Sequence, residues 1–142
     1  VQEKDDSGVF QRGEASAGRK TFERYIRKAA KDFEVHTVPG FYNESLTPDL
    51  RKKFNIKRAA FVNIDCNLYD STLEALRFVT PIVDDGTVIY FDDWFMSGGN
   101  MNMGEAGACG QWLKENPKLK LIEFGNAGTM GKSFIVNVNA NV

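Results

Sequence analysis

The sequence predicts an α/β fold around one βαβ unit, and three features lead to this prediction. Residues 59–64 and 87–91 are short, nearly continuous apolar runs, which are typical of strands covered on both faces. Residues 70–81 lie between them and carry apolar side chains at helical spacing. Two strands joined by a helix in this way pair in parallel through a right-handed crossover. We expect the 142 residues to form a single domain, since a chain of this length can bury its own core.

Upstream of this unit the sequence predicts a loop, a helix and a strand. Residues 1–16 mix charged side chains with Gly and Ser, which is typical of a loop. In residues 17–30 apolar side chains recur every three or four positions, and this spacing predicts a helix. Residues 32–38 alternate apolar and polar side chains and stop at Pro39, so we expect a strand there.

Two helix starts carry capping signals. Thr47 precedes Pro48, which predicts a short helix over residues 48–54 with Thr47 as its N-cap and Pro48 at its first position. The Asp-Ser-Thr segment 70–72 is expected to cap the helix of the βαβ unit.

The C-terminal third predicts one helix and a hairpin. A Gly- and Met-rich loop follows the second strand and leads into a helix that contains Trp112 and stops at Pro117. Residues 119–124 and 133–138 predict two further strands, and the short connection between them makes them antiparallel. We therefore expect a mostly parallel sheet with a C-terminal antiparallel strand.

Composition excludes several classes of partner. The chain carries 18 Lys+Arg against 19 Asp+Glu, so it has no general positive field for nucleic acid or an anionic membrane. No apolar run approaches the ~20 residues that a bilayer requires, and the N-terminus lacks the pattern of a secretory signal. Cys66 and Cys109 allow at most one disulfide. These features predict a cytoplasmic globular domain with no nucleic-acid and no membrane partner.

Three aspartates follow the two strands of the βαβ unit. Asp65 ends the first strand, and Asp92 and Asp93 end the second. Parallel strands end at the same sheet edge about 4.8 Å apart, so these carboxylates can converge on one point, where ligands of open α/β sheets collect. Converging anions repel unless a cation neutralises them, and Mg²⁺ prefers such oxygen ligands. Strand-end aspartates also cap loops by accepting backbone N–H groups, and the spacing alone leaves both interpretations open.

The same residues carry a family resemblance. Residues 61–73, FVNIDCNLYDSTL, and 85–94, DGTVIYFDDW, resemble the core of the macrocin O-methyltransferase family. In that family one strand ends in I-D-x-D-x-Y, S-T lies in the next helix, and the following strand ends in D-D-Y/W. Residues 40–46 resemble its G-x-F-x-E-T-L segment, and residues 13–16 fall in the loop after its second strand. The chain is similar to the C-terminal part of the family.

The resemblance implies a Rossmann-like class I methyltransferase fold, S-adenosylmethionine as methyl donor, and transfer to a hydroxyl of a sugar or similar natural product. On this resemblance Asp65, Asp92 and Asp93 hold Mg²⁺, which orients the acceptor hydroxyl and lowers its pKa. The partner is then a small-molecule hydroxyl acceptor.

The resemblance also assigns cofactor and catalytic residues. The cofactor-binding residues that it implies within this chain are Gly40, Phe41, Tyr42 and Asp65. It places Asp65 and Asn67 in the catalytic role. In some relatives the proposed base is the second acid of I-D-x-D, or a histidine one residue later. This chain has Asn67 in place of that acid and Leu68 in place of the histidine. An amide does not take up a proton at neutral pH, so the general base is not identified by this carry-over.

In the family, a glycine-rich loop after the first strand and an acid after the second hold much of the cofactor. Both would lie upstream of Val1, so we expect a truncated fold that lacks the first two strands and binds S-adenosylmethionine poorly. Residues 59–65 would then form an unpaired apolar edge, which favours association of two copies, and we expect a homo-oligomer.

Two other functions compete with the methyltransferase. A sugar-nucleotide transferase would use acidic residues on a metal-bound diphosphate, but residues 65–67 form a poor D-x-D motif with no basic cluster beside it. A non-catalytic α/β module would account for Asn67 as a lost base.

Overall fold

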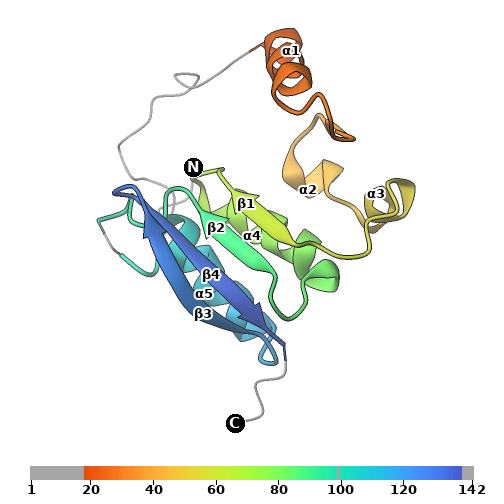
Figure 1. The fold of residues 1–142 in the computed structure, drawn as a ribbon. Coiled ribbons are helices and arrows are strands. Elements are labelled where there is room, and N and C mark those ends of the chain that lie inside the picture. Colours follow the sequence, from red (N-terminus) through yellow and green to blue (C-terminus); the bar gives the residue numbers. More distant parts are fainter. Residues whose placement is uncertain (1–17, 99, 139–142) are drawn as a thin grey trace.

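The computed structural model describes residues 18–98 and 100–138 (Figure 1). The expected N-terminal loop, with the family-like segment 13–16, lies outside the described residues. The elements in chain order are α1 (Arg19–Ala29), α2 (Tyr42–Ser45), α3 (Pro48–Lys53), β1 (Phe61–Ile64), α4 (Tyr69–Val79), the 3-10 turn η2 (Thr80–Ile82), β2 (Val88–Phe91), α5 (Gly104–Glu115), β3 (Lys120–Ala127) and β4 (Gly131–Asn137). None of the helices in these ranges is long and apolar enough to span a bilayer.

The described strands form one sheet in the order β1-β2-β4-β3. β1 and β2 are parallel, with Phe61 opposite Val88 and Ile64 opposite Phe91, which confirms the βαβ unit. β4 is antiparallel to both β2 and β3, so the C-terminal hairpin is also confirmed. The expectation of a mostly parallel sheet is wrong. The tight turn after β3 reverses the chain, and β4 then enters beside β2, so two of the three strand pairs are antiparallel.

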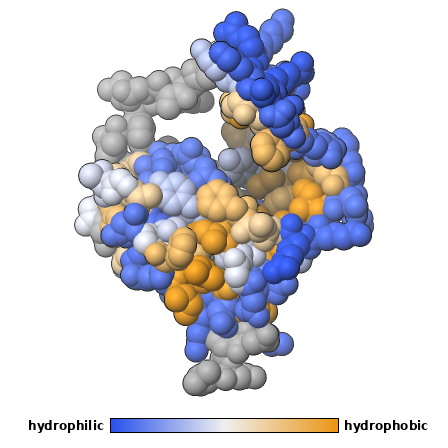
Figure 2. Space-filling model, viewed as in Figure 1, coloured by the Kyte–Doolittle hydropathy of each residue, from blue (hydrophilic) through white to orange (hydrophobic). Residues whose placement is uncertain are grey.

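The core lies between the sheet and the helices α4 and α5, which cover one face of the sheet (Figure 1). Trp112 is fully buried, and its Nε1–H donates to Thr80 Oγ1 at 2.8 Å. Apolar side chains remain visible on the sheet side that faces the viewer in Figure 2. Phe61 on β1 and Ile122 on β3 are 59% and 53% exposed. β1 is an edge of the described sheet, and the self-association expected there stays a prediction.

The expected strand over residues 32–38 is not formed, and this prediction is wrong. Residues 34–39 have no regular secondary structure, and no described strand pairs with them. Alternating side chains suit a strand, but a strand also needs a neighbour for its backbone N–H and C=O groups. The segment instead lies against α1, and together they line a cavity of about 510 Å³. Figure 1 shows α1 standing apart from the sheet.

The two capping predictions differ in outcome. Thr47 caps α3 as expected, since its Oγ1 accepts a hydrogen bond from the Leu50 N–H at 3.3 Å. The prediction for α4 is wrong, because Leu68 is its N-cap and makes no side-chain cap hydrogen bond. Thr72 faces inward instead, and its Oγ1 lies 3.4 Å from Cys66 Sγ. Burial of Thr72 against the core outweighs its preference for a helix terminus.

Candidate functional site

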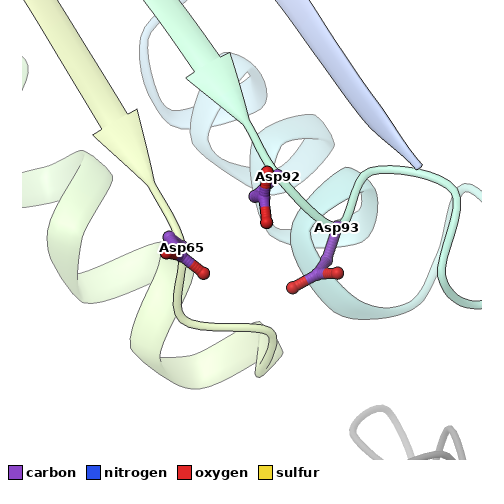
Figure 3. Close-up of side chains that lie close together, drawn as sticks. All are labelled: Asp65, Asp92 and Asp93. Carbon is purple, nitrogen blue, oxygen red and sulfur yellow. The ribbon is translucent and has the colours of Figure 1, made fainter. Parts of the chain in front are cut away.

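The three aspartates meet at one edge of the sheet. Asp65 directly follows β1, and Asp92 and Asp93 directly follow β2, whose end lies beside that of β1 because the two strands are parallel. One carboxylate oxygen from each residue lies within 4.8 Å of the other two. Figure 3 shows the carboxylates gathered around the space between the two strand ends. The predicted convergence of these side chains is confirmed.

The electrostatics of this cluster favour a cation. Asp65 and Asp92 are exposed, whereas Asp93 is half-buried. Burial raises the pKa of Asp93, and the negative charges of Asp92 and Asp65 raise it further. The carboxylates of Asp65 and Asp92 therefore make ionisation of Asp93 less favourable. A positive ion between the three carboxylates would offset this repulsion.

Tyr90 fixes one member of the cluster. Its Oη–H donates to Asp92 Oδ1 at 2.6 Å, and this bond raises the pKa of Tyr90 to about 12. The Tyr90 ring lies over Gly131, where a Cβ atom would come within 2.7 Å of Tyr90 Cε2. The sequence pattern alone did not indicate a role for Tyr90. The available signal was its position two residues before Asp92, since alternate strand residues share one face of the sheet.

A buried glutamate joins the two acidic strand ends. Glu105, in the first turn of α5, is 1% exposed. Its Oε1 accepts from the N–H groups of Cys66 and Asn67 at 3.4 and 3.3 Å, and its Oε2 accepts from Asp93 N–H at 3.0 Å. Burial raises the pKa of Glu105 to about 7, against the opposing effect of these hydrogen bonds. In the alternative interpretation, the strand-end aspartates accept hydrogen bonds from backbone N–H groups of the loops. For these three N–H groups the acceptor is Glu105 instead.

Asn67 has a conformational role in the loop after β1. Its φ is 60°, in the left-handed region where asparagine is enriched among non-glycine residues. Gly104 also has a positive φ, and a Cβ on it would lie 3.4 Å from the Asn67 carbonyl oxygen. The start of α5 thus packs closely against this loop. This conformation gives a structural reason for Asn67 beside the catalytic role that the resemblance implied.

The residues expected to bind cofactor lie on the segment that enters α2. Gly40 has a φ of +127°, which favours glycine, and Phe41 is 79% exposed. Tyr42 starts α2, which packs against α4. Burial raises the pKa of Tyr42, and the charges of Cys66 and Asp65, which follow β1, raise it further. That Gly40, Phe41 and Tyr42 bind the cofactor stays a prediction.

Comparison with known proteins identifies the family. The family model described as macrocin-O-methyltransferase (TylF) matches residues 14–106, which is more than half of the chain. The chain belongs to the macrocin O-methyltransferase family. The matched range contains Gly40, Phe41, Tyr42, Asn67, the three aspartates and Glu105. A comparison with curated proteins gives no match.

Two solved structures of methyltransferases have a fold similar to that of this chain. One is the O-methyltransferase NovP, with 21% identity, a TM-score of 0.63, and coverage of 84% of this chain and 45% of NovP. The other is the apo structure of CalS11, a TDP-rhamnose 3'-O-methyltransferase of calicheamicin biosynthesis. Its identity is 18% and its TM-score is 0.56, over 86% of this chain and 54% of CalS11. The chain thus spans about half the length of these two proteins.

Proposed function

We propose that this chain is part of an S-adenosylmethionine-dependent, Mg²⁺-assisted O-methyltransferase that acts on a hydroxyl of a sugar or similar natural product. The observation that carries this proposal is the convergence of Asp65, Asp92 and Asp93 within 4.8 Å in a member of an O-methyltransferase family. CalS11, which shares the fold, is described as acting on a TDP-linked sugar, and this supports the proposed class of acceptor.

The donor set fits a hard divalent cation. All three ligands are carboxylate oxygens, and two of the three side chains are exposed, which leaves room for water and a substrate oxygen. Bound Mg²⁺ would supply positive charge that lowers the pKa of a nearby hydroxyl. The chain's own residues hold this geometry, since Tyr90 orients Asp92 and the neighbouring loops share hydrogen bonds to Glu105.

Catalysis also needs a group that receives the hydroxyl proton. We propose Asp65 for this position, because its carboxylate is exposed at the end of β1, within 4.8 Å of the other two carboxylates that would hold the cation. Asn67 lies two residues further along the chain. Its amide does not take up a proton, so its role toward the methyl-accepting substrate is limited to hydrogen bonding.

S-adenosylmethionine is the methyl donor that the family implies. Gly40, Phe41, Tyr42 and Asp65 are the residues of this chain that we propose contact it. We also propose that the main cofactor cradle lies in sequence upstream of Val1, in keeping with a chain that spans about half of NovP and CalS11. The 142 residues alone should then bind S-adenosylmethionine weakly, and micromolar binding in calorimetry would contradict this division of the site.

The experiment that tests the function measures S-adenosylhomocysteine formation by the protein with its natural upstream sequence. TDP-rhamnose and related deoxysugar nucleotides serve as acceptors, with Mg²⁺ or with EDTA. We expect turnover that EDTA suppresses and that D65N reduces by at least 100-fold, since general acid–base catalysis alone contributes about 10²–10⁴-fold. Turnover insensitive to both would contradict the proposed mechanism, and no turnover with any hydroxyl acceptor would favour the non-catalytic module.

A further inference from the structure

Glu105 connects two loops that are distant in sequence and adjacent at the candidate site. We propose that Glu105 is a positioning residue that fixes the separation of the acidic ends of β1 and β2. This inference rests on the proposed function, because its consequence is measured on the cation site that the function requires.

The hydrogen bonds of Glu105 divide between the two loops. Oε1 accepts from Cys66 and Asn67, at 3.4 and 3.3 Å, and Cys66 directly follows Asp65. Oε2 accepts from Asp93 N–H at 3.0 Å, so this oxygen is bonded to the backbone of a cluster member. One rigid carboxylate therefore sets the distance between the backbone beside Asp65 and the backbone of Asp93.

The chemistry of the contact requires a carboxylate. All three partners are N–H donors, and a carboxylate presents acceptors on both oxygens. A glutamine at this position keeps one acceptor, but its NH₂ group would face a backbone N–H on one of the two loops. Burial disfavours the charged form of Glu105 and raises its pKa, whereas the hydrogen bonds from the three N–H groups favour the charged form and offset part of that cost. A residue that only filled space would not need to bear this cost.

The start of α5 is itself held in place, so the carboxylate has a fixed base. Gly104 lies close to the loop after β1. A Cβ added to it would be 3.4 Å from the Asn67 carbonyl oxygen and 3.3 Å from Ser97 Oγ. Gly107 lies so close to the backbone of Asn102 that an added Cβ would be 2.7 Å from its carbonyl oxygen. Glycines on both sides of Glu105 thus allow the start of α5 to pack closely against the loop after β1 and against the segment that precedes the helix.

The test compares E105Q with E115Q, the same substitution at the exposed end of the same helix. Mn²⁺ binding to the 142-residue chain is measured from the free-ion EPR signal, and folding is monitored by circular dichroism. We expect E105Q to weaken Mn²⁺ binding by about tenfold or more, the range found for groups that orient metal ligands, and E115Q to leave it unchanged. The shorter carboxylate in E105D should give an intermediate loss, and it carries the test if E105Q does not fold.

Amide hydrogen exchange separates this inference from the proposed function. In the wild-type chain without metal, the N–H groups of Cys66, Asn67 and Asp93 should be protected, and E105Q should expose them. Wild-type protein that binds no Mn²⁺ contradicts the proposed function. The positioning role is overturned if the wild-type protein binds Mn²⁺ and E105Q binds it equally well. It is also overturned if the three amides are as well protected in E105Q as in the wild type.

Discussion

Replacing Gly107 by alanine should destabilise the protein and disturb the site through α5. A Cβ at this position would come within 2.5 Å of the Asn102 carbonyl carbon and 2.7 Å of its oxygen. Ordinary contacts between such atoms are about 3.5–4.0 Å, so backbone must move by roughly 1 Å. Because the opposing atoms belong to the main chain, no side-chain rotation relieves the overlap.

The magnitude follows from two opposing effects. Overpacking in a well-packed region costs typically about 1–3 kcal/mol. Alanine gains about 1 kcal/mol over glycine in a helix, so the free energy of unfolding of G107A should fall by up to about 2 kcal/mol. Gly110 lies on the same helix, and a Cβ there meets nothing within 4 Å. G110A should therefore raise the free energy of unfolding by up to about 1 kcal/mol.

Urea unfolding followed by circular dichroism measures both variants under one condition. G107A and G110A differ only in what the new methyl group meets, so their difference isolates the overlap with Asn102. G107A should also weaken Mn²⁺ binding, because Glu105 lies in the same helical turn, whereas G110A should not. Equal stability of the two variants would refute the steric argument, and an unchanged Mn²⁺ affinity in a destabilised G107A would refute the link to the site.

Two further predictions concern the surface and the sheet. The Arg77 guanidinium holds the pKa of Glu115 at about 2, below its ordinary value of 4.5. This ion pair therefore stabilises the fold at neutral pH, and the stabilisation is lost as the pH falls from 4.5 through 2. E115Q should lower the free energy of unfolding by less than about 1 kcal/mol at pH 7, since the pair is largely exposed. Chemical denaturation should find that most of this difference is lost by pH 2. A difference independent of pH would contradict the prediction. G131A should displace the Tyr90 ring and lower the urea midpoint, whereas G125A on the neighbouring strand, whose Cβ would lie 4.0 Å from the nearest side-chain atom, should not. Equal midpoints for these two alanine variants would show that the ring moves aside freely.

The central βαβ unit could be predicted because its signals are local. Two buried runs and an amphipathic segment determine strand, helix and strand, and the parallel pairing then places Asp65 beside Asp92 and Asp93. The metal-ligand hypothesis needed only this topology, since side chains that follow adjacent parallel strands leave the sheet at one edge.

The predictions that failed depended on distant partners. Residues 32–38 have the alternation of a strand, but strand formation needs a neighbouring strand, which the local pattern does not reveal. The place of β4 between β2 and β3 is likewise a property of the whole sheet. Glu105 lies 39 residues from Cys66, and no spacing rule connects the two. An acid inside a glycine-rich stretch was the available signal, and its burial became evident only in the folded chain.

The central claim is that Asp65, Asp92 and Asp93 form one divalent-cation site. Mn²⁺ titration of the wild-type chain, D65N and D93N, with Mg²⁺ as competitor, tests it most directly. Asp49→Asn is the matched control, because Asp49 is an exposed aspartate on α3 that pairs with Lys52. We predict a single weak site that Mg²⁺ competes for, an affinity reduced by about tenfold or more in D65N and D93N, and no change in D49N. Equal Mn²⁺ binding by all four proteins would contradict the account.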